Sequence, residues 1–179
     1  PQRSQIDDLD RHTVFLFQFA GCRQTFVQHA AVTDQRAVGA GADESAAIRE
    51  KLAARNVTLL ASPVSGNGKT VKAGKLSCVV SGPADAFEVA KPYLETVAAN
   101  GVAYVGEGDL ARFCKIAHNV FLGVVIQNLA EITVLAEKAG IPRHAFLEFI
   151  NNSVLGSIFS RYKSPALVNL DFTTTFTPT

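Results

Sequence analysis

Methionine and tryptophan are absent from this chain of 179 residues, and only three cysteines are present. The cysteines are widely spaced and form no C-x-x-C pair, so their spacing indicates neither a zinc site nor a disulfide framework. We therefore expect Cys22, Cys78 and Cys114 to be reduced thiols of an intracellular protein. Because methionine is missing, we also expect the natural start of the protein to lie outside the sequence.

A strong charge of either sign is missing as well. The chain carries 17 basic and 16 acidic residues, a formal net charge of +1, and has no run of lysines or arginines that could follow phosphates. No stretch approaches the roughly 20 consecutive apolar residues that cross a bilayer, and no leader resembles a signal peptide. We expect neither nucleic acid nor a membrane as a partner, and we expect a cytoplasmic location.

Strand and helix patterns alternate in the first part of the chain. The hydrophobic content of 47% is enough for one substantial core. Short apolar runs predict strands, and longer segments with helical periodicity predict helices. The predicted strands are residues 13–17, 57–61, 76–80 and 103–105, and the predicted helices are residues 44–54 and 83–99. This alternation is typical of an α/β fold, although most of the first 43 residues show no clear period.

One long helix dominates the second part of the chain. Asp109 is a plausible N-cap, and the helix is expected to end where Gly140 and Pro142 interrupt the pattern. Its apolar residues recur every three or four positions, and at about 1.5 Å per residue it is roughly 45 Å long.

Two shorter helices are predicted after the long one, at residues 142–150 and 156–167. We therefore expect two domains. Residues 1–107 carry the α/β pattern, and residues 108–179 carry helices only.

A glycine-rich loop, S-P-V-S-G-N-G-K-T at residues 62–70, follows a predicted strand. Ligands of α/β sheets bind beyond the carboxyl ends of strands, so this loop is a candidate site. In one interpretation, Ser65 and the backbone amides around Gly66 and Asn67 hold a carboxylate, because glycine lets an anion approach the amide groups closely.

Two other interpretations of the same loop remain open. The G-K-T at residues 68–70 could end a nucleotide-binding P-loop, although Pro63 stands where that motif begins with glycine and Gly74 interrupts the helix that should follow. The loop could also be a surface turn that binds nothing.

Lys115 and Asn119 form the second candidate site. They lie four residues apart on the long predicted helix, about 40° from each other around its axis, so both can reach one small ligand. Lys115 lies away from the apolar stripe, which fits a lysine facing a cleft and equally a solvated one. His118 could transfer protons near neutral pH, but it lies about 100° from Asn119. We expect His118 to be packed or partly exposed, and not grouped with Asn119.

Three motifs occur in the order and spacing of a known family. L-L-A-S-P-V-S-G-N resembles the substrate-binding motif D-A-P-V-S-G-G, and V-G-E-G-D-L-A-R-F-C-K-I-A-H-N resembles a glycine turn that leads into K-x-x-x-N. N-L-A-E-I-T-V-L-A-E-K-A-G-I is similar to the rest of an interdomain helix. On these motifs, residues 44–176 resemble the β-hydroxyacid dehydrogenases, which include 3-hydroxyisobutyrate dehydrogenase and tartronate semialdehyde reductase.

The resemblance implies both a fold and an activity. The fold is expected to be α/β, with an incomplete Rossmann-type parallel-sheet domain, a long interdomain helix and an all-helical domain. The expected activity is hydride transfer between NAD or NADP and a small β-hydroxy acid, such as 3-hydroxyisobutyrate, or its semialdehyde. Such enzymes are homodimers or homotetramers whose helical domains interlock.

The resemblance also implies roles for the two candidate sites. Ser65, Gly66 and Asn67 would bind the substrate carboxylate. Lys115 would transfer the proton, and Asn119 would position Lys115 and the substrate. An ammonium group suits this role because the substrate hydroxyl must lose its proton as hydride leaves the neighbouring carbon.

The sequence departs from the family pattern at three points. The dinucleotide motif G-x-G-x-x-G is not recognised, so cofactor binding is implied by the resemblance alone. Asn67 and Ala61 replace a glycine and an aspartate of the substrate motif. A K-D motif of the family would fall beyond Thr179, so we expect a chain truncated at both ends.

Two further hypotheses follow from these departures. The chain could be a non-catalytic fragment whose long helix drives oligomerisation, or a P-loop nucleotide-binding protein. The sequence does not select the hydroxy acid, nor does it select NAD over NADP.

Overall fold

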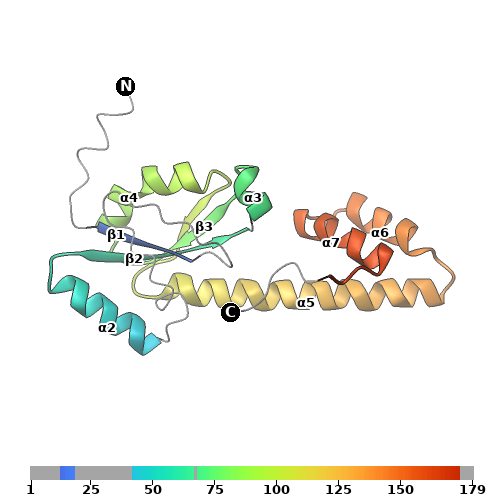
Figure 1. Cartoon of the computed structure of the whole chain (residues 1–179), viewed down its shortest axis with the longest axis horizontal. Coiled ribbons are helices and arrows are strands. Elements are labelled where there is room, and N and C mark those ends of the chain that lie inside the picture. The colour runs from blue at the N-terminus through green and yellow to red at the C-terminus, as the bar shows by residue number, and fades with distance from the viewer. Residues whose placement is uncertain (1–12, 19–41, 67, 174–179) are drawn as a thin grey trace, which may run out of the picture. The chain divides into compact units, whose positions relative to one another are not determined.

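The strands form one sheet in the order β1-β2-β3-β4 (Figure 1). The structure, a computed structural model, describes residues 13–18, 42–66 and 68–173. The strands are β1 (Thr13–Gln18), β2 (Thr58–Ser65), β3 (Ser77–Val80) and β4 (Val102–Tyr104). All four predicted strands are confirmed, while most of the segment without a clear period lies outside the described residues.

The sheet is mixed. β1 pairs with β2 and β3 pairs with β4 in parallel, but β2 and β3 are antiparallel. The expected α/β class is confirmed, and the expected parallel pairing holds for β1 with β2 and for β3 with β4 but not for β2 with β3. A parallel crossover needs about a dozen residues or more, usually with a full helix. The connection at residues 66–76 contains only the five-residue helix α3 (Gly68–Lys72).

β2 is longer than the sequence predicted. Residues 62–65, expected in a loop, continue the strand, and residues 59–64 are all buried. Pro63 signals a turn in sequence because it lacks an amide hydrogen. In the structure Pro63 pairs with Gln18 of β1, and its side chain is almost fully buried. Cover on both faces of this central strand therefore outweighs the local turn signal.

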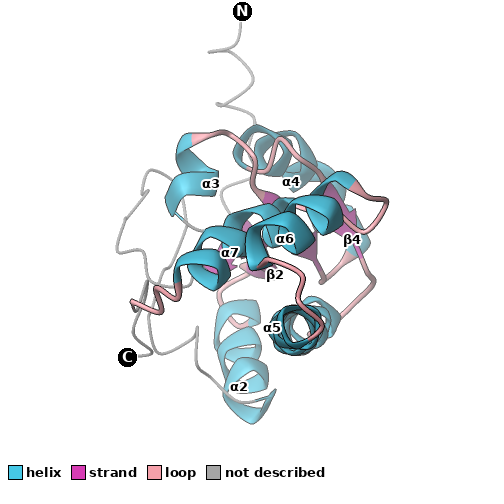
Figure 2. Ribbon diagram, turned by 90° about the vertical axis from the view of Figure 1, so that its right-hand side faces the viewer, coloured by secondary structure: helices cyan, strands magenta, loops and turns pink. Residues whose placement is uncertain are grey.

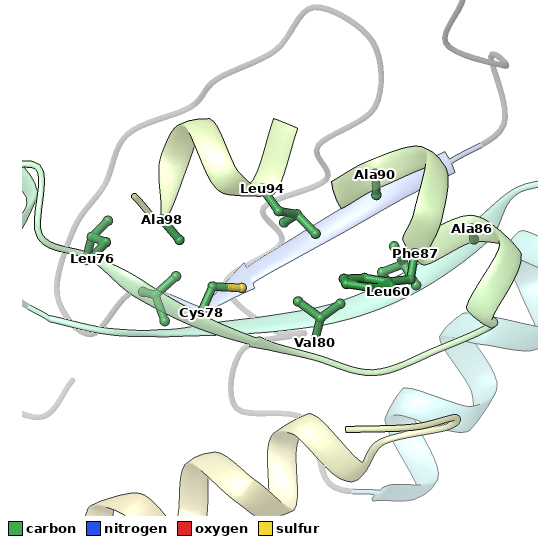
Figure 3. Close-up of a cluster of buried hydrophobic side chains, with 10 residues drawn as sticks. Leu60, Leu76, Cys78, Val80, Ala86, Phe87, Ala90, Leu94 and Ala98 are labelled. Carbon is green, nitrogen blue, oxygen red and sulfur yellow. The ribbon is translucent and has the colours of Figure 1, made fainter. Parts of the chain in front are cut away.

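Helix α4 (Ala84–Val97) covers one face of the sheet (Figures 1 and 3). Figure 3 shows Phe87 and Leu94 of α4 directed toward Leu60, Cys78 and Val80 of the strands. Full burial of a side chain such as Leu94 contributes roughly 1.5–3 kcal/mol. Helix α2 (Ala42–Ala53) and the first turns of α5 (Leu110–Lys138) lie on the opposite face.

The chain divides into two compact units, Pro1–Ile116 and Ala117–Thr179, so that α5 contributes to both. In the second unit, α6 (Arg143–Asn152) and α7 (Ile158–Asn169) pack side by side (Figure 2). The core of this unit contains Leu129 of α5, Leu147 of α6 and Leu167 of α7. The three helices predicted for this part of the chain are confirmed.

The apolar stripe of α5 is only partly buried. Leu129 and Ala136 are buried, whereas Phe113 is 71% and Phe121 69% exposed. By length and composition alone, α5 could also cross a membrane, which the sequence analysis did not foresee; core helices of soluble proteins meet the same criterion. The exposed part of the stripe is an apolar surface that the described residues leave uncovered.

Candidate active site

The first candidate site begins at the carboxyl end of β2. Ser65 is half-buried, and Gly66 follows with φ +145°. A Cβ at Gly66 would lie 2.6 Å from a methyl carbon of Leu76 and 2.8 Å from one of Thr70. Glycine is therefore required here by backbone conformation and by space. Asn67, the third residue predicted to bind the carboxylate, lies outside the described residues.

The structure disfavours a P-loop in this segment. The position of the first P-loop glycine is Pro63, which is buried inside β2 and cannot line an anion cradle. The helix that follows, α3, has only five residues and ends at a turn in which Gly74 N donates to Val71 O. A P-loop places its phosphates at the amino end of a full-length helix.

Lys115 lies early in α5 and is half-buried. This burial lowers the pKa of its ammonium group below the ordinary value of 10.5, because a partly buried site disfavours the charged form. A fully solvated lysine, the alternative left open by the sequence, does not fit this environment. Phe113, two residues earlier on α5, is 71% exposed. In the first turns of α5, an apolar side chain is therefore more exposed than the lysine.

Asn119 follows Lys115 by four residues on the same uninterrupted helix, as predicted. Its Oδ1 lies 3.2 Å from Nδ1 of His118. The expectation that His118 is partly exposed is confirmed, but the expectation that it is not grouped with Asn119 is wrong. The side chains of adjacent helical residues leave the axis in different directions, yet these two are long enough to bend toward each other.

The start of α5 is held by residues that the sequence analysis did not identify. The hydroxyl of Ser81, fully buried after β3, accepts from Ala111 N (3.0 Å) and donates to Gly108 O (2.8 Å). Asp109 accepts the first helical amides through its backbone carbonyl, as an N-cap should. Ser81 therefore supplies a side-chain cap from a different part of the chain.

The carboxylate of Asp109 is bound by the Arg49 guanidinium of α2. Partial burial by itself would raise the pKa of Asp109. The hydrogen bonds from Arg49 and Ser45, together with the charges of Arg49 and Arg112, outweigh burial and lower that pKa below its ordinary value of 3.8. Asp109 is therefore an ionised, fixed anion at neutral pH.

The turn between β4 and α5 has the strand-turn-helix order of a dinucleotide loop, with glycines at 106 and 108. It does not fit a pyrophosphate. The amide of Ala111 is already bound by Ser81, and the Asp109 carboxylate would repel a phosphate at this helix end. Within residues 13–18, 42–66 and 68–173, no cluster of His, Cys, Asp and Glu could hold a metal ion.

Two of the predicted free cysteines lie among the described residues. Cys78 is buried in the sheet, and desolvation raises the pKa of its thiol to about 12. Cys114 is exposed on α5. The third, Cys22, lies outside the described residues.

Two family models match this chain, one over each part of it. Residues 23–106 match the family described as the NAD binding domain of 6-phosphogluconate dehydrogenase. Residues 109–178 match the family described as NAD-binding of NADP-dependent 3-hydroxyisobutyrate dehydrogenase. The chain belongs to the β-hydroxyacid dehydrogenase family. The first match begins at residue 23, well before the first motif that the sequence analysis recognised.

Two relatives of this chain are named dehydrogenases. It is 34% identical over 110 residues to 3-hydroxyisobutyrate dehydrogenase of Pseudomonas aeruginosa, covering 62% of the chain and 37% of that protein. It is 31% identical over 132 residues to L-threonate dehydrogenase of Haemophilus influenzae, covering 74% of the chain and 44% of that protein. The chain thus spans less than half the length of these relatives.

Solved structures of the family share the fold. A 3-hydroxyisobutyrate dehydrogenase from Salmonella typhimurium superposes with a TM-score of 0.63 at 29% identity, over 74% of this chain and 47% of that one. The Mycobacterium tuberculosis 3-hydroxyisobutyrate dehydrogenase, in a structure with L-serine, gives a TM-score of 0.62 at 24% identity over 76% and 49%. These superpositions confirm the Rossmann-type α/β class with a following helical part. The family uses NAD or NADP as its cofactor.

Proposed function

We propose that this chain is part of an NAD(P)-dependent oxidoreductase that transfers hydride between the nicotinamide and a small β-hydroxy acid or its semialdehyde. The observation that carries the proposal is the partly buried Lys115 on α5, four residues before Asn119, in a chain of this family. A lysine with a lowered pKa can exchange a proton nearer to neutral pH than a solvated one.

Lys115 and Asn119 would act on the oxygen that changes its protonation. In oxidation, the hydroxyl proton of the substrate would pass to the Lys115 amine, while the carbon that bears this hydroxyl would lose hydride to a bound nicotinamide. In reduction, the Lys115 ammonium returns the proton to the carbonyl oxygen. Asn119 would orient both the oxygen and the lysine through its side-chain amide, whose oxygen is already directed by His118.

The substrate carboxylate would be bound at the end of β2. Ser65 offers a hydroxyl, and Gly66, with φ +145°, turns the backbone just beyond the end of β2, where its amide groups would bind the anion. Asn67 would add a side-chain amide where the family motif has glycine. The substrate we propose is a small hydroxy acid, with 3-hydroxyisobutyrate and L-threonate as the first candidates because two relatives are named for them.

The test begins with the chain as it stands. Titration of intrinsic or nucleotide fluorescence with NADH and NADPH should give saturable binding. Turnover is then measured with 3-hydroxyisobutyrate, L-threonate and related acids. Lys115→Met should reduce kcat by at least about a hundredfold, within the range expected for loss of a general acid–base, while nucleotide affinity stays within twofold. Activity that persists in this variant removes Lys115 from the mechanism.

A second candidate function rests on the exposed apolar surface of α5, and the same experiment distinguishes it. A chain that forms a tight oligomer but binds neither nucleotide is a non-catalytic, oligomerising fragment. In that case the family assignment stands and the catalytic proposal fails for this chain. Binding of ATP that depends on Lys69 would instead support the P-loop hypothesis.

We also propose that the protein is a cytoplasmic homodimer or homotetramer. The support is the exposed apolar surface of α5, which contains Phe113, Val120, Phe121 and Val124. Large apolar and aromatic side chains of this kind are typical of the buried centre of subunit interfaces. Since α5 falls within the match to a dehydrogenase domain, its apolar surface is better explained by protein contacts than by lipid.

A further inference from the structure

The guanidinium of Arg49 connects helix α2 to strand β2 and to the turn before α5 by hydrogen bonds. From α2, Arg49 donates to Leu59 O of β2 through Nη1 (2.9 Å) and to Gly108 O through Nη2 (2.7 Å). Nη2 also binds the Asp109 carboxylate. Leu59 and Gly108 are 10 and 59 residues from Arg49 along the chain, so this is a tertiary contact and not a local one.

The turn that Arg49 holds has little of its own to fix it. Gly106 and Gly108 both have positive φ, at +109° and +64°, and neither has a side chain that could pack. The carbonyl oxygen of Gly108 instead accepts from Arg49 on one side and from the Ser81 hydroxyl on the other. With both lone pairs of this oxygen engaged, the two donors fix the Gly108 end of the turn, while Gly106 O accepts from Gly82 N (3.0 Å) at its other end.

Lys115 follows this turn closely. It comes six residues after Asp109, about one and two-thirds turns into a continuous helix. A shift or tilt of the first turn is therefore carried to Lys115 by the rigid helix. Displacement of a reacting group by about 1 Å can reduce a rate by about a hundredfold.

We propose that Arg49 is a positioning residue for Lys115. Through Gly108 and Asp109 it fixes where α5 begins, and so it fixes where the Lys115 amine meets the substrate. The inference rests on the proposed role of Lys115 in proton transfer. A guanidinium suits the task because its planar fork can serve a carbonyl and a carboxylate at the same time, whereas a lysine offers a single point charge.

The first test is kinetic and uses the full chain. Arg49→Met should lower kcat between about tenfold and about a hundredfold, with KM for the nucleotide within twofold. Arg49→Lys, which keeps the charge but not the fork, should give an intermediate kcat. Asp109→Asn should lower kcat in the same direction by a smaller factor. Arg55→Met is the matched control, because Arg55 is exposed in the turn after α2, and it should leave kcat unchanged.

The second test does not require turnover. Lys115 is labelled with an amine-acylating reagent over a range of pH, and the extent of labelling is read by peptide mass spectrometry. In Arg49→Met, the labelling midpoint of Lys115 should move to higher pH, since a displaced amine loses part of the burial that lowers its pKa. The extent of labelling of exposed Lys91 should be the same in both proteins. A shift that persists in Arg49→Lys comes from displacement and not from lost charge.

The outcomes separate this inference from the proposed function. If folded Arg49→Met, with an unchanged melting temperature, keeps the kcat and the Lys115 labelling midpoint of the unaltered chain, the positioning role is overturned. If the unaltered chain has no turnover, the proposed function fails for this chain and the labelling result still decides the position of Lys115. Should Arg49→Met not fold, Arg49→Lys and Asp109→Asn carry both tests.

Discussion

Lys115 combines a positive charge with partial burial, and this combination lowers the stability of the fold. Its pKa is lower in the folded protein than the ordinary 10.5, so the folded state binds fewer protons than the unfolded chain between those two values. The free energy of unfolding therefore rises with pH across that interval and is depressed at neutral pH. The proposed proton transfer needs the same burial, so stability and function oppose each other at this residue.

Replacement of Lys115 by the uncharged Met should therefore stabilise the fold while it abolishes the proposed turnover. We expect Lys115→Met to melt at a higher temperature than the unaltered chain at pH 7. The difference should shrink as the pH approaches 10.5, where the lysine loses its charge in both states. Thermal unfolding followed by circular dichroism measures this. Lys91→Met, on the exposed face of α4, is the control and should show no such pH-dependent gain.

Gly66 is constrained twice, by its positive φ and by its close approach to Leu76 and Thr70. Gly66→Ala should destabilise the first unit by about 1–3 kcal/mol, the usual cost of a side chain in such a strained conformation. Gly74→Ala is the matched control, because its φ is also positive but a Cβ there would meet nothing within 4 Å. Urea unfolding of both variants should rank Gly66→Ala as the less stable. Equal losses would show that the contacts with Leu76 and Thr70 do not matter.

The sequence predicted Lys115 and Asn119 because a helical spacing and a family motif coincide there. It did not predict Ser81 or Arg49, whose partners at the start of α5 lie 27 to 60 residues away along the chain. No periodicity encodes a contact of that kind, since it depends on how β3, α2 and α5 are brought together. The contact between the side chains of His118 and Asn119 was also missed. Helical periodicity predicts the direction of each Cβ atom, but it does not predict where the end of a flexible side chain lies.

At the scale of helices and strands, the local sequence patterns predicted the existence of the elements more accurately than the residues at which they end. Long amphipathic helices such as α5 carry many consistent positions, so their prediction was robust. The end of β2 was misplaced because Pro63 and the polar Ser62 resemble a loop, while burial between β1 and β3 decides their conformation. The direction of β3 was missed for a related reason: pairing is a property of the assembled sheet.

The cap on α5 is an element-scale feature with a measurable cost. Ser81→Ala removes the acceptor for the amide of buried Ala111 and one of the two donors to Gly108 O. We expect a loss of about 0.5–2 kcal/mol in the free energy of unfolding, typical of a removed N-cap side chain. Chemical denaturation measures it. Ser77→Ala, at the start of β3 and only half-buried, should lose less, and an equal loss in both variants would argue against the capping role of Ser81.

At the scale of the whole molecule, the exposed apolar surface of α5 is the feature that bears on assembly. The chain spans less than half the length of the named relatives, and the apolar surface of α5 is left uncovered by the described residues. Side chains such as Phe113 and Phe121 would each gain roughly 1.5–3 kcal/mol on full burial. An exposed surface of this kind is typical of a subunit interface and is a liability for a monomer.

The homo-oligomer can be tested by placing a charge in this surface. Phe121→Glu should reduce the mass measured by size-exclusion chromatography with light scattering to that of a monomer, because an unpaired carboxylate would be desolvated in the interface. Val89→Glu, on the exposed face of α4, is the control and should keep the oligomer. The same samples are mixed with phospholipid vesicles and sedimented. An unaltered chain that is monomeric and sediments with the vesicles, while Phe121→Glu does not, would show that the surface of α5 meets lipid and that the oligomer proposal is wrong.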